Sequence, residues 1–426
     1  MDSARITAAK ALIKVDRGGF SQLVLDAALS NAKLDGRDAA FCSALFYGVI
    51  ERRLTLDHCI AKYSRHALSD TVANVLRLAF YQLIYLDSVP AHAAVDEAVE
   101  MTKSLGQRAA SGMVNGILRS FLRDGCKIPA IKGGKVQKLA INYSCSEQIT
   151  ELLTDWYGLE TAESILKASM GRPPLFARVN TLKTDAASVI EHMPEYIKSE
   201  TPILDGNCLG MTGDVAHTAS HKIGFLHIQD ICSQQAALTL EAQPGQRILD
   251  VCAAPGSKSF VLAQQMKNEG EIISCDIYEN RLGLISKGAK RLGISIIKAK
   301  QNDGSVYNPE MGEFDRILCD VPCSGLGVLR RKPEIKYRDT GSLEELAELQ
   351  YKILETSSKY LKAGGMLVYS TCTVNPNENE KVIKRFLKEN SGFEAAPFEE
   401  NVWYKTNLPD EKGGDGFFIS RIRRVQ

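Results

Sequence analysis

The stretch Arg247-Ile-Leu-Asp-Val-Cys-Ala-Ala-Pro-Gly-Ser-Lys258 decides the fold of the C-terminal part of this chain. Its apolar first residues predict a short buried strand, which ends in a turn of small residues before a helix expected at Ser259–Met266. Small residues let a ligand approach the backbone, and the start of a helix offers unpaired N–H groups. Gly256 is the one glycine of this turn, so the G-x-G-x-x-G pattern of a dinucleotide site is missing. The stretch predicts a ligand site of another kind.

Acidic residues stand at the ends of three expected strands. Asp250 ends the first strand, Asp276 lies twenty residues after Gly256 at the end of Glu271–Cys275, and Asp303 follows Ser295–Ala299. In doubly wound α/β folds a carboxylate at such a strand end binds the hydroxyl pair of a ribose. An acid after the third strand can accept a hydrogen bond from an adenine amino group. Three acids in succession therefore predict a cofactor that contains a nucleoside.

Two cysteines follow the next two expected strands. Phe314-Asp-Arg-Ile-Leu-Cys-Asp-Val-Pro-Cys-Ser-Gly325 brings Asp320 and Cys323 to the carboxyl edge of the sheet, and Gly365-Met-Leu-Val-Tyr-Ser-Thr-Cys-Thr373 brings Cys372 there. A cysteine inside a strand usually packs as a small apolar residue. These two lie beyond their strands, at the edge where α/β sheets place active sites. We therefore expect both thiols to have a chemical role.

The remaining patterns divide the chain into segments with different periodicities. Residues 4–123 repeat apolar positions at helical spacing, residues 141–235 mix helix and strand, and residues 236–426 alternate short β-rich runs with helical patterns. The predicted fold is multidomain. It has an all-α domain over 1–125, a basic linker over 126–140, a small α+β domain over 141–235 and an α/β Rossmann-like domain over 236–426.

The charge of the chain is balanced overall but uneven locally. The 426 residues hold 52 Lys and Arg against 51 Asp and Glu, so a uniformly basic nucleic-acid binder is excluded. Residues 1–140 nevertheless carry 19 basic and 13 acidic side chains. Within them lies what we call the basic strip: Lys103, Arg108, Arg119, Arg123, Lys127, Lys132, Lys135 and Lys138, with Asp124 as the one acid among them. Such a density fits phosphate contacts, although a solvated helix face is the plainer interpretation.

Composition also limits the compartment and the metal chemistry. We find no apolar segment of the roughly 20 residues that a membrane helix needs, and no signal-peptide core. We expect a cytoplasmic protein whose eleven cysteines are reduced thiols. No cysteine pair has the C-x-x-C spacing of a zinc site, so we expect no metal.

The motifs resemble a known family over nearly the whole chain. DVCAAPGSK, DVPCSG and STCTVNPNENE resemble the core motifs of the Sun/Fmu-type RNA cytosine-C5 methyltransferases, as do ARVNTLK, IQDICSQQAA and GDGFF. The N-terminal YGVIERR, LRLAFYQLIYLDSVPAHAAVDEAVE and VNGILR are similar to the NusB-like RNA-binding domain of the bacterial 16S ribosomal RNA branch. That branch methylates cytosine 967 of 16S ribosomal RNA, which the resemblance implies as the target.

The resemblance implies a role for each candidate residue. Cys372 would be the nucleophile, Cys323 would assist elimination and product release, Asp320 would hydrogen-bond the cytosine edge, and Lys258 would place a positive charge beside it. S-adenosylmethionine would be bound by Cys252, Ala253, Ala254, Pro255, Gly256, Ser257, Lys258, Asp276, Asp303 and Asp320. The chain departs from the family pattern at Ser257, Val321, Ile231-Cys232 and Cys145-Ser146. None of these departures removes a cysteine of the two motifs or a strand-end acid.

The chemistry explains why such a reaction needs thiols. C5 of cytosine is too weak a nucleophile to accept a methyl group directly, but a thiolate that adds to C6 turns the ring into an enamine. The thiolate is the reactive form, so the site must remove the proton of the cysteine. A cytosine inside a helix must first be unstacked, which favours loops. The N-terminal domain would hold folded RNA by its phosphates and shape.

Three alternatives remain open from the sequence. A transfer RNA cytosine-C5 methyltransferase would use the same chemistry. A DNA-type mechanism would make Cys323 the nucleophile, although the intact Thr371-Cys372 motif argues against it. A non-catalytic RNA-binding assembly or antitermination factor would have lost these residues, and all are present. We expect a monomer with 16S ribosomal RNA as its partner and no membrane contact.

Overall fold

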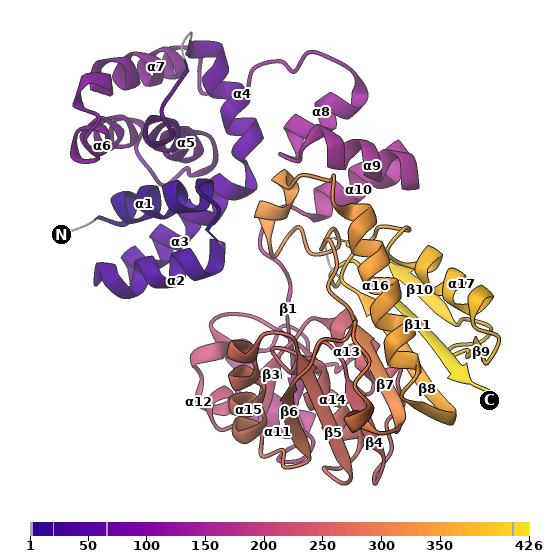
Figure 1. Cartoon of the computed structure of the whole chain (residues 1–426). Helices are drawn as coiled ribbons and strands as arrows, with labels where there is room; N and C mark the ends of the chain where they lie inside the picture. The colour runs from indigo at the N-terminus through magenta and orange to yellow at the C-terminus, as the bar shows by residue number, and fades with distance from the viewer. Residues whose placement is uncertain (1–2, 20, 65–66, 411–412) are drawn as a thin grey trace. The chain divides into compact units, whose positions relative to one another are not determined.

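The computed structural model describes residues 3–19, 21–64, 67–410 and 413–426, and its contacts divide the chain into two compact units (Figure 1). The first unit comprises Met1–Gly171 together with Leu329–Arg338, and the second comprises Arg172–Val328 and Asp339–Gln426. The first unit is helical, and the second contains both sheets. The all-α N-terminal domain and the α/β C-terminal domain predicted from the sequence are thus confirmed. The domain boundaries given above stay predictions.

The first unit is built from ten α-helices within its described residues. They are α1 (Ala4–Asp16), α2 (Ser21–Ala32), α3 (Gly36–Glu51), α4 (Arg53–Tyr63), α5 (Asp70–Tyr85), α6 (Ala91–Ser104), α7 (Ser111–Arg123), α8 (Lys135–Asn142), α9 (Glu147–Tyr157) and α10 (Leu159–Ala168). Side chains of Ser3, Asp35 and Ser69 accept hydrogen bonds from backbone N–H groups in the first turns of α1, α3 and α5. Such caps satisfy donors that the helix itself leaves free.

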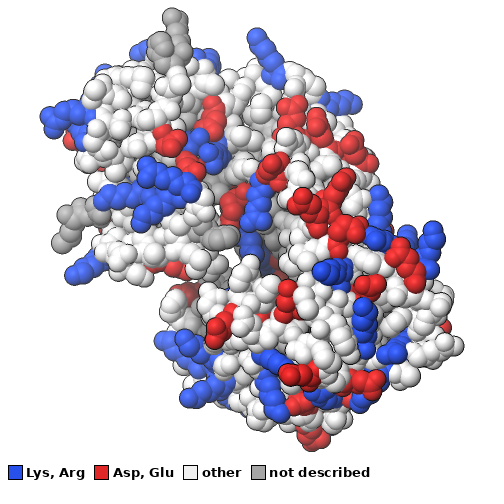
Figure 2. All heavy atoms as spheres, viewed as in Figure 1, with Lys and Arg blue, Asp and Glu red and all other residues white. Residues whose placement is uncertain are grey.

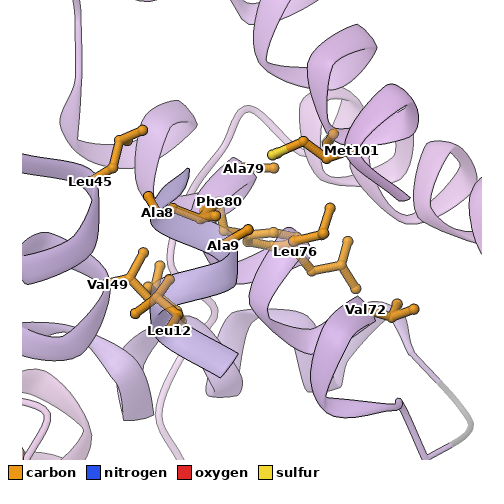
Figure 3. Packing of buried hydrophobic residues seen from close by; sticks show 14 of the residues in the cluster. Ala8, Ala9, Leu12, Leu45, Val49, Val72, Leu76, Ala79, Phe80 and Met101 are labelled. Carbon is orange, nitrogen blue, oxygen red and sulfur yellow. The ribbon is translucent and has the colours of Figure 1, made fainter. Parts of the chain in front are cut away.

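The core of this unit forms where α1 meets α3, α5 and α6 (Figure 3). Ala8, Ala9 and Leu12 of α1 lie beside side chains of α3 and α5, and Met101 of α6 closes the cluster. Because Ala8 and Ala9 have small side chains, larger residues such as Leu45 of α3 and Leu76 of α5 fill the space between the helices. Phe80 of α5 and Phe121 of α7 stack with their ring centroids 4.2 Å apart. The core therefore joins the first helix to the seventh.

Two segments differ from the sequence expectation. The expected linker 126–140 contains most of α8, and α9 and α10 belong to the first unit although they fall within the expected α+β segment. These helices belong to the first unit because residues at the end of α8 contact α4. Ser144 accepts a hydrogen bond from the Leu54 N–H over 2.8 Å, and the Thr55 hydroxyl donates to the Ile141 carbonyl over 2.5 Å. Partners far away in the sequence hold this segment, which no local pattern signals.

The segment Leu329–Arg338 is an excursion of the C-terminal chain into the first unit. It carries the short 3-10 helix η5 (Pro333–Tyr337). Tyr337 donates to the Ile50 carbonyl over 2.6 Å, and the Lys336 carbonyl accepts from the Ser146 N–H over 2.8 Å. Lys336 is fully buried, with Nζ 3.3 Å from the Tyr143 carbonyl and 3.0 Å from the Met170 sulfur. Burial lowers the pKa of Lys336 to about 8.

The second unit begins with a small antiparallel sheet in the order β2-β1-β3. Its strands are β1 (Leu175–Val179), β2 (Cys208–Met211) and β3 (Leu226–Ile228), accompanied by α11 (Ala186–His192) and α12 (Ala219–Lys222). Arg178 is almost fully buried and forms a bidentate ion pair with Asp205, with both distances 2.7 Å. It also donates to Gln264 over 3.0 Å. The ARVNTLK motif therefore fastens the small sheet to the larger domain.

The large sheet has the order β10-β11-β8-β7-β4-β5-β6, and β9 also pairs with β11. Its strands are β4 (Arg247–Asp250), β5 (Glu271–Asp276), β6 (Ile297–Gln301), β7 (Phe314–Asp320), β8 (Leu361–Thr371), β9 (Phe393–Ala395), β10 (Tyr404–Asn407) and β11 (Phe417–Arg424). The strands from β6 to β8 are parallel, and β11 runs antiparallel to β8. The chain steps outward from β4 through β5 to β6 and then returns to β7 on the other side of β4. Doubly wound sheets bind ligands at such a switch point.

In the part of the chain that the structure describes, five α-helices accompany the strands of the large sheet. The connecting helices are α13 (Ile231–Leu238), α14 (Ser257–Gln265), α15 (Glu279–Leu292), α16 (Leu343–Ser358) and α17 (Glu380–Glu389). On the face drawn in Figure 2, basic and acidic side chains are interspersed, in keeping with the balanced net charge. Among the described residues, no helix is long and apolar enough to cross a membrane.

Burial of Lys336 makes a prediction about stability and pH. Between about pH 8 and pH 10.5 the unfolded chain holds this proton more tightly than the folded protein does, so folding stability rises with pH. Lys336→Met removes that dependence. We expect the variant to gain stability over the wild type at pH 7, and this gain to shrink by about 2–3 kcal/mol at pH 10.

Denaturant unfolding of the full chain at both pH values measures this difference. Lys332→Met is the matched control, because Lys332 lies in the same segment and is exposed. A gain for Lys336→Met that is equal at the two pH values would contradict the burial argument.

Candidate active site

The turn between β4 and α14 lies at the switch point of the sheet. It holds the predicted ligand-binding residues Cys252, Ala253, Ala254, Pro255, Gly256 and Ser257, and Ser257 begins α14. Gly256 has φ of +107°, and a Cβ atom there would lie 2.7 Å from the Phe260 ring. Only glycine fits this position without strain. The turn therefore brings backbone close to the N-terminal end of a nine-residue helix, where free N–H groups are available.

Asp250 lies buried beneath this turn. It is 1% exposed, and its Oδ2 accepts a hydrogen bond of 2.6 Å from Ser259, while Oδ1 has no partner among the described residues. Burial raises the pKa of this carboxyl to about 7. A buried oxygen without a partner is costly, which marks the place as one where a ligand donor can be accepted.

The other two strand-end acids lie along the same edge. Asp276 ends β5, accepts from the Tyr278 N–H over 3.0 Å and pairs with Arg281 over 3.2 Å. Arg281 also donates to the Ala254 carbonyl over 2.8 Å, so it joins Asp276 to the turn. Asp303 is exposed and accepts from the N–H and hydroxyl of Ser305. Strand β6 runs two residues further than expected, and Asp303 still follows it.

Lys258 and Asp320 form an ion pair in the middle of the edge. The Lys258 Nζ lies 2.6 Å from Asp320 Oδ2, and Ser370 donates to Asp320 Oδ1 over 2.8 Å. Burial alone would lower the pKa of Lys258, but the nearby charge of Asp320 outweighs it and raises that pKa. Lys258 is therefore a positive charge held beside Asp320.

The sulfurs of Cys323 and Cys372 lie 3.0 Å apart. The hydrogen bond to Cys372, burial, and the charges of Cys372 and Glu378 together raise the pKa of Cys323 well above its usual value. The proton therefore stays on Cys323. Negative charge on Cys372 is one of the contributions that raise the pKa of Lys258, so the ammonium and this sulfur interact. The two sulfurs are thus in hydrogen-bond contact, and the raised pKa favours the protonated form of Cys323.

Glycines bring the loops of the two cysteines together. The Gly327 N–H donates to the Cys372 carbonyl over 3.1 Å, and the Gly416 N–H donates to the Gly327 carbonyl over 2.8 Å. A Cβ atom on Gly327 would collide with the Gly416 carbonyl. The GDGFF motif therefore packs against the loop that follows Cys323.

Sequence reasoning missed Ser370 and Arg281 as residues of this site. Ser370 lies directly opposite Asp320 in the parallel pairing of β7 with β8. It precedes Cys372 by two positions, so strand alternation could have placed it on the same face. Arg281 lies in the first turn of α15 and carries no local signal of its own. Among the described residues we find no group of acidic, His or Cys side chains that could hold a metal ion.

Comparisons with known proteins agree with this architecture. The family model described as "16S rRNA methyltransferase RsmB/F" matches residues 237–423, and the NusB family model matches residues 2–123. A probable ribosomal RNA small subunit methyltransferase B of Bacillus subtilis (strain 168) is 35% identical, with 99% of each chain covered. The ribosomal RNA small subunit methyltransferase B of Shigella boydii serotype 4 is 33% identical, covering 92% of this chain and 91% of the relative.

Solved structures share the fold. The structure of a methyltransferase homolog protein from Pyrococcus horikoshii matches with a TM-score of 0.59 and 28% identity, covering 69% of this chain and 100% of that chain. The crystal structure of PH0851 matches with a TM-score of 0.83 at 23% identity, covering 99% of this chain and 98% of that chain. Because the identity to the Bacillus subtilis relative extends through both the helical domain and the sheet domain, the chain belongs to the RsmB/F family of 16S rRNA methyltransferases, in its form with an N-terminal NusB domain.

Proposed function

We propose that this chain transfers a methyl group from S-adenosylmethionine to C5 of a cytosine in 16S ribosomal RNA, through a covalent bond between Cys372 and C6 of the base. The observation that carries the proposal is the pair of sulfurs 3.0 Å apart beside the Lys258–Asp320 ion pair. The resemblance of the motifs to the cytosine-C5 branch supports the same chemistry and suggests position 967 as the target.

The residues around the β4–α14 turn fit S-adenosylmethionine. The close backbone at Gly256, the unpartnered Asp250 oxygen and the acid at the end of β5 match a ligand that has a ribose and positively charged groups. Asp276 would bind the ribose hydroxyls, and Asp303 would meet the adenine. Bound there, S-adenosylmethionine supplies an electrophilic methyl group. The residues of the β4–α14 turn would hold that ligand.

Cys372 begins the reaction. Its sulfur adds to C6 of the base, and the electron pair of the C5=C6 bond moves to C5, where it is delocalised over C4 and N3, so that C5 becomes nucleophilic. The ammonium of Lys258 favours the thiolate form of Cys372 by its charge. Each Asp320 oxygen accepts one hydrogen bond from the protein and has a lone pair left for the amino group of cytosine.

Cys323 acts when the product is released. The C5 proton leaves to water, the C5=C6 bond forms again, and the bond between C6 and the Cys372 sulfur breaks. Cys323 retains its proton at 3.0 Å from the departing sulfur. It can therefore donate a hydrogen bond as negative charge returns to Cys372, which lowers the barrier to elimination.

The basic strip is the part of the first unit best suited to hold RNA. Arg108, Arg119, Arg123, Lys127, Lys132, Lys135 and Lys138 are exposed, whereas Lys103 is half-buried and paired with Glu100. Asp124, the one acid of the strip, is paired with Lys62 over 2.6 Å. Its charge is thus compensated from outside the strip, which leaves the strip positive toward phosphate.

The first prediction separates the two cysteines. Cys372→Ala removes the nucleophile, so methyl transfer should fall to background and no covalent species should form. Cys323→Ala leaves attack possible and impairs elimination, so the protein should accumulate covalently bound to RNA. Denaturing gel electrophoresis with labelled RNA measures the adduct, and Cys319→Ala, inside β7, is the control. Adducts in Cys372→Ala and none in Cys323→Ala would show the DNA-type assignment instead.

The second prediction concerns the cofactor. Asp276→Ala removes a charged hydrogen-bond acceptor for the ribose, a loss of about 1.5–3 kcal/mol, or roughly 10- to 150-fold in affinity. Calorimetry with S-adenosylmethionine in the absence of RNA measures it, and Glu310→Ala, an exposed acid elsewhere in the domain, is the control. An affinity that is unchanged in Asp276→Ala would reject this assignment.

The third prediction concerns the basic strip. Replacing Lys132 and Lys135 with Gln should reduce the slope of log affinity for RNA against log salt by roughly 0.7–0.9 for each phosphate that is no longer neutralised. The control replaces Lys267 and Lys359 with Gln. These two exposed lysines precede β5 and β8, at the edge of the large sheet opposite the candidate active site. Equal slopes in the wild type and in the strip variant would mean that these lysines are only a solvated face.

A further inference from the structure

Two neighbouring residues after β8, Glu378 and Asn379, are both fully buried next to the cysteine pair. They belong to the motif STCTVNPNENE, but the reaction described above gives them no role. Their side chains reach back to the backbone around both cysteines. This placement makes them candidates for setting the geometry of the two sulfurs.

Glu378 holds the residues on either side of Cys323, together with Gln350 of α16. The Ser324 N–H donates to Glu378 Oε2 over 2.8 Å. The amide of Gln350 donates to the Pro322 carbonyl over 2.9 Å and to the same Glu378 oxygen over 2.8 Å. The peptide groups before and after Cys323 are therefore both fixed by one buried pair of side chains.

Asn379 does the same for Cys372. Its amide donates to the Thr373 carbonyl over 3.0 Å, and its oxygen accepts from the Thr371 hydroxyl over 2.6 Å. Thr371 and Thr373 flank the cysteine, and both are fully buried. Glu378 and Asn379 are adjacent in the chain, but each bonds to the backbone or side chains around a different cysteine, so each sulfur has its own support.

Burying the carboxylate of Glu378 to hold a loop costs free energy, because a buried charge loses its hydration. It is buried and its hydrogen-bond donors are neutral: Ser324, Gln350 and, on Oε1, Asn375 over 2.8 Å. A glutamine would avoid burying a charge. The charge has an effect on the reaction, since it is one of the causes that raise the pKa of Cys323 and so keep the proton on that sulfur.

We propose that Glu378 and Asn379 are positioning residues for two different steps, Glu378 for elimination through Cys323 and Asn379 for attack through Cys372. The inference rests on the proposed function. A residue that only stabilised the fold would affect both steps alike. Positioning residues with separate supports should instead change two different quantities. Loss of the Glu378 contacts should raise the ratio of covalent adduct to methylated product, and loss of the Asn379 contacts should slow adduct formation without raising that ratio.

Two isosteric substitutions test this. Glu378→Gln replaces an acceptor that faces N–H donors with an amide, so Cys323 should be misplaced and the ratio of adduct to product should rise about tenfold, as expected for the loss of one hydrogen bond. Asn379→Asp loses the donor to Thr373, so the rate of adduct formation should fall about tenfold with no rise in that ratio. Quench experiments on denaturing gels measure both quantities.

Controls separate the outcomes. Asn377→Ala changes an intervening side chain of the same loop and should behave as the wild type. Gln350→Leu removes the donor to Pro322 and should also raise the ratio, so the test stands if Glu378→Gln does not fold. Melting temperature and affinity for S-adenosylmethionine are measured alongside.

Adduct and product that fall in equal proportion in both variants would overturn the inference, as would wild-type behaviour in both. If Cys323→Ala and Cys372→Ala still show their opposite phenotypes in that case, only the positioning roles are wrong. If Cys323→Ala forms no adduct, the proposed function itself has failed.

Discussion

The contact of 3.0 Å between the sulfurs of Cys323 and Cys372 depends on the register of two parallel strands. Asp320 of β7 lies opposite Ser370 of β8, so the two strands end at the same level. Cys323 lies three residues beyond that pair and Cys372 two residues beyond it. Because side chains alternate along a strand, a slip of one residue would turn Ser370 away from Asp320. The hydrogen bond from Ser370 to Asp320 and the contact of the two sulfurs thus depend on the same strand register.

The chain between these two strands also enters the first unit. Only five residues separate Cys323 from Leu329, where the segment that belongs to the helical unit begins. That segment is held by hydrogen bonds of the Tyr337 hydroxyl and of the Lys336 carbonyl, and the Lys336 side chain is fully buried. Burying a lysine without a carboxylate bonded to it opposes folding, and its pKa is lowered accordingly. The helical unit therefore includes a segment that lies, in the sequence, between the two cysteines of the site.

Much of the site could be predicted because it follows from strand ends. The buried runs before Asp250, Asp276 and Cys323 gave the strands, and a parallel sheet brings their carboxyl ends to one edge. The all-α region was equally readable from helical periodicity. The Leu329–Arg338 segment was not, since its many charged residues are typical of an exposed loop and its partners lie 166 to 287 positions away. The roles of Glu378 and Asn379 as supports of the cysteines could not be predicted either, because the run Asn375-Pro-Asn-Glu378 is equally typical of a helix start.

The central claim is that Cys372 forms the covalent bond to the base, and trapping tests it most directly. A 16S ribosomal RNA fragment that carries 5-fluorocytosine at the target lets the attack and methyl transfer occur but blocks elimination, because C5 bears fluorine in place of the proton. Digestion of the trapped wild-type complex and peptide mass spectrometry then identify the modified cysteine. The account predicts that the peptide with Cys372 carries the nucleotide and the added methyl group. A nucleotide found on Cys323 would contradict it, as would methylation of ordinary RNA with no trapped complex.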